Sequence, residues 1–168
     1  MNKFLIVIIL ISTIFIQYFK DLTERPTYNP IKIEKPIIFD GAVDNQEWSK
    51  AQIATNFNGS GTFQGQPSDL RTEARLFYDE KNIYVGFIAY VDKEDLRYSI
   101  TKRDNLDEKD DRVWINIDAF DDEALTYGIG VSAGGVQIDG RATYGFDKSL
   151  DLIYESKVSV YDDRYEAE

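Results

Sequence analysis

The sequence has 168 residues, with 19 Lys and Arg against 30 Asp and Glu, and a formal net charge of −11. It contains no His and no Cys, which excludes a Ser–His–Asp triad, thiol catalysis, disulfides and metal centres built on His or Cys. The length and the 43% of hydrophobic residues indicate about one folded domain, and the acidic surface disfavours nucleic acid as a partner.

Residues 1–19 are predicted to form a signal peptide or a membrane anchor. Lys3 precedes an apolar run from residue 4 to residue 19, and a short basic start followed by a long apolar stretch is typical of export signals. The run ends without an A-x-A-like cleavage site, so the sequence leaves open whether the segment is removed. Export predicts a location in the periplasm, the outer membrane or the cell surface, with residues 4–19 as the membrane contact if they are kept.

Residues 20–35 are predicted to be an extended linker because prolines and mixed charges are frequent there. The folded domain is then expected over residues 36–168. It begins with a short predicted strand at residues 37–41. One helical turn follows, with Asp44 as its N-cap and Trp48 as a buried core residue.

The rest of the chain alternates apolar and polar residues in the way that strands require. Residues 72–78 and 83–91 predict a hairpin joined by a four-residue turn. Further strands are expected over residues 113–119, 125–131, 136–138 and 153–160, and from residue 165. With no long amphipathic helix, the pattern predicts an all-β sandwich with short helical turns. Because the last strand stops at its third residue, we expect the chain to be cut short at its carboxyl end, before a further domain of the same protein.

Trp114 is the candidate for ligand binding. Its neighbours Val113 and Ile115 belong to the apolar face of their strand, so the pleat places Trp114 on the opposite face with Asn116 and Asp118. An exposed indole beside an amide can stack on a sugar ring while polar groups bind the hydroxyls. The alternative is that both faces of the sheet are covered and that Trp114 is a core residue.

Two acidic clusters are candidate calcium sites, because calcium takes six to eight oxygen ligands from carboxylates and carbonyls of flexible loops. The first consists of Asp104, Asp107, Asp110 and Asp111, and the second of Asp118, Asp121, Asp122 and Glu123. Neither has the order of an EF-hand loop. The second follows directly on a predicted strand, which fixes the position of Asp118, and it is the preferred metal site. The alternative is plain surface charge.

Four segments in order carry a resemblance to a known family. Residues 38–48, I-F-D-G-A-V-D-N-Q-E-W, resemble the opening of carbohydrate-binding module family 9 domains. Residues 76–85 resemble the central hairpin of that family, and residues 110–118 resemble its D-x-V-x-I-x-I-D strand. Residues 130–139 are similar to a variant found at the front of larger bacterial envelope proteins.

The resemblance implies a jelly-roll or immunoglobulin-like β-sandwich, carbohydrate binding and structural calcium, with Asp118 at the matching position. The sequence also departs from the family pattern. Sugar-binding members hold the sugar between two tryptophans, yet residues 106–110 contain no aromatic side chain, and Gly130 and Ser132 stand where relatives carry Arg and Asn. Trp114 and Asn116 are therefore the sugar-binding candidates of this chain.

The function expected from the sequence is that of an exported, non-catalytic carbohydrate-binding module associated with polysaccharide breakdown, whose partner is a polysaccharide or an oligosaccharide. No catalytic residue is predicted, because close carboxylate pairs are too frequent for their spacing to single out one pair. Two alternatives stay open. One is a structural envelope domain that does not bind sugar and supports a C-terminal part, and the other is a part of a glycoside hydrolase.

Overall fold

A computed structural model describes residues 26–59, 65–122 and 124–168. The predicted export segment at residues 1–19 lies outside the described residues. Within the described ranges the secondary structure is almost entirely β, apart from one 3-10 turn, η1 (Trp48–Lys50). None of the helices in this part of the chain has the length and apolar character needed to cross a membrane.

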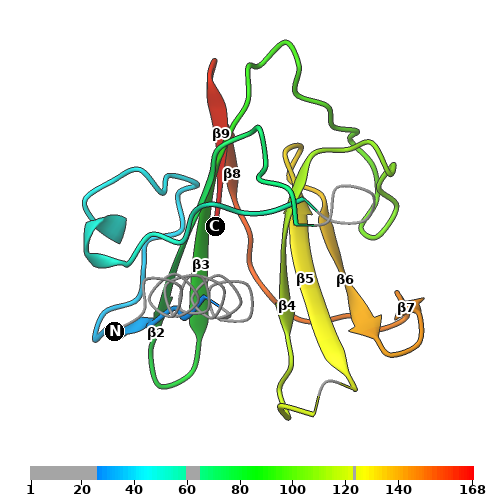
Figure 1. Ribbon diagram of the computed structural model, residues 1–168, viewed down its shortest axis with the longest axis horizontal. Helices are drawn as coiled ribbons and strands as arrows, with labels where there is room; N and C mark the ends of the chain where they lie inside the picture. Colours follow the sequence, from blue (N-terminus) through cyan, green and yellow to red (C-terminus); the bar gives the residue numbers. More distant parts are fainter. Residues whose placement is uncertain (1–25, 60–64, 123) are drawn as a thin grey trace, which may run out of the picture.

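The described strands form two sheets that together make a sandwich-like arrangement (Figure 1). The first sheet has the order β1-β2-β3-β9-β8, and its strands are β1 (Ile31–Lys32), β2 (Thr72–Tyr78), β3 (Ile83–Tyr90), β9 (Arg164–Ala167) and β8 (Val158–Val160). The second sheet has the order β4-β5-β6-β7, and its strands are β4 (Arg112–Ile117), β5 (Thr126–Ser132), β6 (Gln137–Ala142) and β7 (Phe146–Asp147). The predicted all-β sandwich is confirmed.

One hydrophobic core lies between the two sheets. Val113 and Val131 of the second sheet pack in one cluster with Tyr165 and Ala167 of β9, and Phe87 of β3 packs against them. Alternating residues of a strand point to opposite faces, so this cluster marks the inner face of each sheet. Burial in the core raises the pKa of Tyr165 far above its ordinary value.

The predicted hairpin of β2 and β3 is confirmed, with antiparallel pairing from Thr72 opposite Ala89 to Tyr78 opposite Ile83. Its turn is held by Asp79, whose Oδ1 accepts hydrogen bonds from the backbone N–H groups of Lys81 and Asn82, both at 2.7 Å. The Tyr84 hydroxyl donates to Oδ2 of the same carboxylate, also at 2.7 Å. The bond from Lys81 and then that from Tyr84 lower the pKa of Asp79 to about 2.

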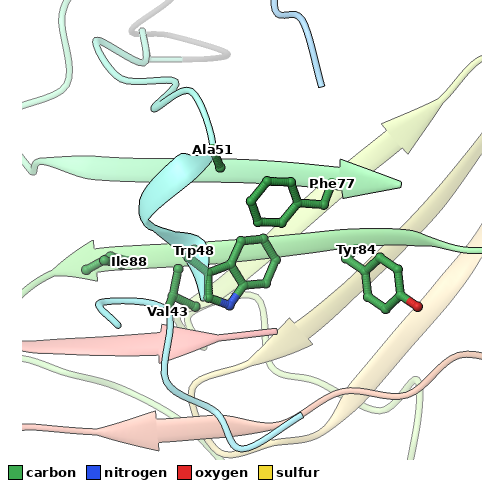
Figure 2. Packing of buried hydrophobic residues seen from close by; sticks show 6 residues of the cluster. All are labelled: Val43, Trp48, Ala51, Phe77, Tyr84 and Ile88. Atoms are coloured by element: carbon green, nitrogen blue, oxygen red, sulfur yellow. The ribbon is translucent and has the colours of Figure 1, made fainter. Parts of the chain in front are cut away.

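A second core covers the outer face of the hairpin (Figure 2). The indole of Trp48 is 0% exposed, as predicted for a core residue, and it stacks on Phe77 with 5.3 Å between ring centroids. Beneath it lies Gly86 of β3, where an added Cβ would come within 2.8 Å of Val43 and 3.1 Å of the indole. A residue larger than glycine at this position would hold the arm of residues 40–51 away from the sheet.

Two carboxylates of the last strand segment hold this arm in place. Glu168 accepts hydrogen bonds from the backbone N–H of Gly41 at 2.6 Å and from the indole N–H of Trp48 at 2.9 Å. Glu166 accepts bonds from the backbone N–H groups of Val43 at 2.6 Å and Asp44 at 3.0 Å. Burial raises the pKa of Glu168 above its ordinary value. The arm therefore needs no strand partner, because its N–H groups are bound by side chains.

These contacts explain where the predicted elements of the arm are wrong. Residues 37–41 form no strand. Asp44 does not cap the helical turn; instead Asn45 Oδ1 accepts hydrogen bonds from the backbone N–H groups of Glu47 at 2.9 Å and Trp48 at 3.2 Å. An Asn side chain that binds the backbone two and three residues ahead forms a local turn of its own.

Two further segments differ from the predicted secondary structure. Part of the predicted linker, Ile31–Lys32, forms β1 and pairs in parallel with β2. The strand predicted at residues 153–160 is confined to Val158–Val160. The first half of that segment contacts the second sheet and does not pair with the first. The Gln137 amide of β6 donates hydrogen bonds to the Tyr154 carbonyl at 3.1 Å and to Ser156 Oγ at 3.0 Å.

Candidate functional site

Trp114 lies on the outer face of the second sheet, as the pleat predicts. Its partner across the β4–β5 ladder is Gly130, and Asn116 is opposite Gly128. An added Cβ on either glycine would overlap with the indole of Trp114, so the ring lies flat against the bare backbone of β5. Two glycines at alternate positions of one strand thus form the bed on which the indole rests.

Phe146 of β7 completes the aromatic surface. Its ring meets the indole of Trp114 edge-on, with 5.4 Å between the centroids. Here too a glycine makes room, because a Cβ on Gly140 would lie 2.6 Å from Phe146 Cζ. The half-buried indole and the exposed phenyl ring line an open groove of about 470 Å³ together with Leu106, Glu108, Arg112, Asn116, Ile138 and Lys148.

Asn116 is brought together with Trp114, as predicted. The indole N–H of Trp114 donates a hydrogen bond to Asn116 Oδ1 at 2.7 Å. This contact fixes the orientation of both side chains and uses the amide oxygen, while within the described residues the amide Nδ2 donates to no protein acceptor. The exposed amide can therefore offer two N–H donors to a ligand hydroxyl at the edge of the ring.

The loop of the preferred calcium site follows β4. Asp118 Oδ1 accepts hydrogen bonds from the backbone N–H of Phe120 at 3.2 Å and of Asp122 at 3.5 Å, and Asp121 has a positive φ of 53°. Glu123 lies outside the described residues. Among the residues that are described, no three carboxylates of this loop form a group with oxygens within 4.8 Å of one another.

Calcium binding at Asp118, Asp121 and Asp122 stays a prediction that a melt can check. Binding to the native state alone stabilises it by about 2.7 kcal/mol at a free calcium concentration of 100 times Kd, or roughly 5–10 °C in Tm. We expect calcium to raise Tm and Asp118→Ala to abolish the rise. Identical melts of the unchanged protein in calcium and in chelator would contradict the site.

The first acidic cluster is divided by the fold. Asp110 and Asp111 hold the loop that precedes β4, because Asp110 accepts a hydrogen bond from Ser99 Oγ at 3.1 Å and Asp111 accepts one from the backbone N–H of Arg97 at 2.8 Å. Asp104 lies elsewhere, beside β6, where its backbone N–H donates to the Gln137 carbonyl at 3.1 Å. The four acids predicted together therefore do not form one site.

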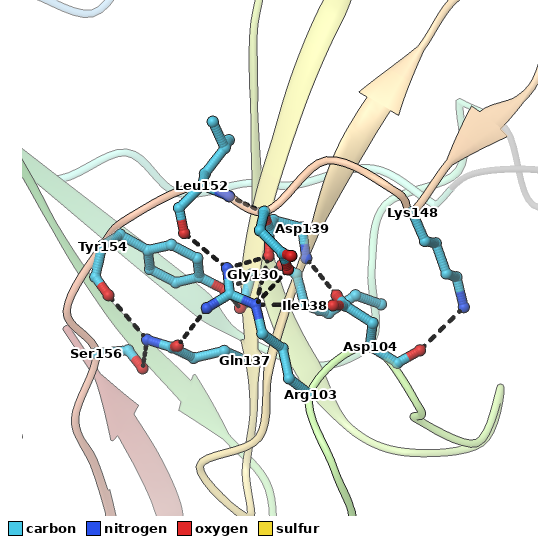
Figure 3. Close-up of polar contacts among 11 residues, drawn as sticks. Arg103, Asp104, Gly130, Gln137, Ile138, Asp139, Lys148, Leu152, Tyr154 and Ser156 are labelled. Carbon is cyan, nitrogen blue, oxygen red and sulfur yellow. Dashed lines mark hydrogen bonds and ion pairs between the residues drawn. The ribbon is translucent and has the colours of Figure 1, made fainter.

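Asp104 belongs to a different carboxylate group, shown in Figure 3. Asp104, Asp139 and Asp151 place their oxygens within 4.8 Å of one another, but Arg103 lies among them. Its guanidinium forms an ion pair with Asp139 and lies 3.7 Å from oxygens of both Asp104 and Asp151. A cation is thus already supplied by the protein, so the group is an ion-pair network.

The ion-pair network contacts the strands that carry the aromatic site. Arg103 Nη1 donates to Gln137 Oε1 at 3.0 Å and Nη2 to the Leu152 carbonyl at 2.7 Å. The Tyr154 hydroxyl lies 2.8 Å from the carbonyl oxygen of Gly130, on the strand that carries Trp114, and burial raises the pKa of Tyr154 to about 12. The network therefore ties the loops of residues 103 and 152–154 to the strands below the groove.

Sequence reasoning missed Phe146 and the glycine bed. Phe146 follows the three connecting residues 143–145 and lies on a strand of only two residues, so no alternation marked it. The signal that could have found the bed is the pair Gly128 and Gly130, because small residues at alternate positions of a strand leave room for a large neighbour on one face.

Comparison with known proteins identifies the domain. The family model described as carbohydrate family 9 binding domain-like matches residues 38–166, which include the arm anchored by Trp48, the strands from β2 to β8, most of β9 and the groove of Trp114. No curated protein and no solved structure matches the chain in the other two comparisons. The match confirms the resemblance drawn from the four sequence segments, and the chain therefore belongs to the carbohydrate family 9 binding domain-like family.

Proposed function

We propose that the groove over Trp114 binds the sugar rings of a polysaccharide or an oligosaccharide, and that the domain is a non-catalytic, calcium-binding module serving polysaccharide breakdown. The observation that carries the proposal is the indole of Trp114, held flat on Gly128 and Gly130 and flanked by Phe146. Aromatic faces of this kind stack on the C–H face of a pyranose, and neighbouring amides bind its hydroxyls. Asn116 supplies such an amide.

The flat pose of the indole gives the proposal a sharp test. Gly128→Ala places a methyl group in the volume of the Trp114 ring, so the indole must leave the sheet and the stacking surface is lost without removing any aromatic residue. Because aromatic stacking contributes about 0.5–1.5 kcal/mol beyond area burial, the affinity for a bound glycan should fall roughly twofold to tenfold. Trp114→Ala removes the ring itself and should lower the affinity for the glycan by a similar factor.

The measurement is titration calorimetry against those soluble oligosaccharides that the unchanged protein binds in a panel of neutral and acidic glycans. Gly145→Ala is the matched control, because a Cβ at that glycine meets nothing within 4 Å. If Gly128→Ala and Trp114→Ala fold and bind every glycan with unchanged affinity, the groove is not the sugar site.

Export is also part of the proposal, and the basic start and apolar run of residues 4–19 support it. A reporter fused behind the complete chain should reach the periplasm or the cell surface. The same fusion without residues 1–19 should stay in the cytoplasm. Fractionation that finds both fusions in the envelope would contradict the export role of this segment.

A further inference from the structure

The groove over Trp114 carries positive charge in a strongly acidic chain. Arg112 and Lys148 both line it, against the single carboxylate of Glu108, whereas the whole chain has a net charge of −11. Arg112 is two residues before Trp114 on β4, and two successive rises along a strand amount to roughly 7 Å. Lys148 follows Phe146 at the same interval, so each aromatic ring has a cation beside it.

Both cations keep their charge available. Within the described part of the chain, neither Arg112 nor Lys148 forms an ion pair with a carboxylate, whereas Arg103 and Arg164 each have several. Arg112 Nη1 donates to the backbone carbonyl of Asp107 at 3.3 Å, and Lys148 Nζ donates to that of Asp104 at 3.4 Å.

Arg112 is the first residue of β4 and Lys148 follows β7, and the two contacts hold both side chains onto the same loop. An Arg has five donors and a Lys has three. Each side chain therefore retains donors for a ligand after binding its carbonyl.

We propose that the ligand of this groove is an acidic sugar, a uronic acid residue within a glycan. The inference rests on the proposed sugar binding and goes beyond it in naming the class of sugar. A uronate ring offers a C–H face to Trp114, and its carboxylate projects from the ring edge, where Arg112 can bind it through two parallel N–H donors. A neutral hexose would leave Arg112 and Lys148 without an anionic partner.

The acidic surface of the protein strengthens the assignment. Repulsion from a chain of net charge −11 acts on any anionic polysaccharide, so binding of such a ligand requires local cations that are not neutralised. The exposed Glu108 adds one negative charge to the groove rim, which two cations outweigh. Binding should therefore weaken with added salt, because exposed charges are screened over about 10 Å at 0.1 M.

The test uses pairs of ligands that differ at the carboxyl group of the uronate, which is charged in one and neutral in the other. Calorimetry with the full chain would compare oligogalacturonate and oligomannuronate with their methyl esters, which keep the ring and lose the carboxylate charge. Hydrogen bonds to charged groups predict that at least one acid binds about tenfold or more tightly than its ester at low salt. Arg112→Gln and Lys148→Gln should each reduce this preference, whereas Lys81→Gln, an equal charge change in the β2–β3 turn, should not.

The outcomes separate the two proposals. Equal affinity for acid and ester, lost in Trp114→Ala, would overturn the acidic-sugar assignment and keep sugar binding at the groove. A preference for the acid that Lys81→Gln reduces as much as Arg112→Gln does would be non-specific charge attraction, and it would also overturn the assignment. Binding of neither form would overturn the acidic-sugar assignment, whereas the neutral glycans of the panel still test the groove as a sugar site. Binding that Trp114→Ala and Gly128→Ala leave unchanged would overturn the groove as a sugar site.

Discussion

Trp48→Ala is expected to lower the free energy of unfolding by about 3–5 kcal/mol, because removing a buried indole leaves a cavity that the surroundings fill only in part. Trp48 is 0% exposed, stacks on Phe77 and donates its N–H to Glu168. Its loss therefore also leaves the buried carboxylate of Glu168 without one of its donors, which adds to the cost.

The second tryptophan of the chain is the matched control. Trp114 rests on the outer face of a sheet and is only half-buried, so Trp114→Ala should cost about 1 kcal/mol or less, as ordinary surface substitutions do. Urea unfolding followed by circular dichroism measures both. Equal midpoints for the two variants would show that Trp114 is a core residue, which was the alternative that the sequence left open.

The alternation of residues predicted the faces of most strands, because side chains point to opposite sides at each step. It placed Val113 and Ile115 inside and Trp114 with Asn116 outside, and the structure agrees. The predicted face of β3 also packs between the sheets through Phe87. Alternation could not show that the opposite face of β3 is buried more deeply, because the arm that covers it is distant in sequence.

The arm was misread for a physical reason. An apolar stretch at residues 37–41 is typical of a strand, since strands satisfy their N–H groups in ladders. Here the acceptors are side-chain oxygens of Glu166 and Glu168, more than 120 residues away along the chain. The family-like motif of residues 38–48 therefore describes a docking arm with Trp48 as its anchor. No local pattern reveals acceptors at such a distance.

The candidate site was predicted in part. Trp114 and Asn116 were found, because both lie on a regular strand whose pleat fixes their direction. Phe146, Arg112 and Lys148 were missed as site residues, because the groove is assembled by the β4-β5-β6-β7 pairing and by a loop before β4. The pairing between strands depends on the whole sheet, so the spacing of residues within one strand cannot predict which strands are neighbours.

The sequence analysis grouped acidic residues into candidate calcium sites because they are close in sequence. In the fold, acids that are distant in sequence contact one another. Asp104 and Asp139 are 35 residues apart, yet the backbone N–H of Asp139 donates to Asp104 Oδ1 at 2.9 Å. The partner that decides their role is Arg103, whose positive charge the sequence analysis did not assign. This ion-pair network underlies the last and largest electrostatic effect we expect.

Arg103→Met is expected to destabilise the fold by about 3–5 kcal/mol, because it leaves the buried carboxylate of Asp139 without its cation. Asp139 is 0% exposed, and besides Arg103 it accepts a hydrogen bond from the backbone N–H of Leu152 at 2.5 Å. Arg141→Met is the matched control. Its pair with Asp147 is 53% and 41% exposed, and exposed pairs contribute about 0–1 kcal/mol.

A double variant separates the buried charge from lost packing. Adding Asp139→Asn to Arg103→Met removes the unpaired charge, so the double variant should be more stable than Arg103→Met alone, by a coupling of about 0.5–3 kcal/mol. Urea midpoints at unchanged m-values measure the difference. Equal midpoints for Arg103→Met and Arg141→Met would contradict the network.

Where Arg103→Met still folds, its affinity for glycans should also fall. Arg103 packs over the ring of Tyr154, and the Tyr154 hydroxyl donates to the Gly130 carbonyl beneath Trp114.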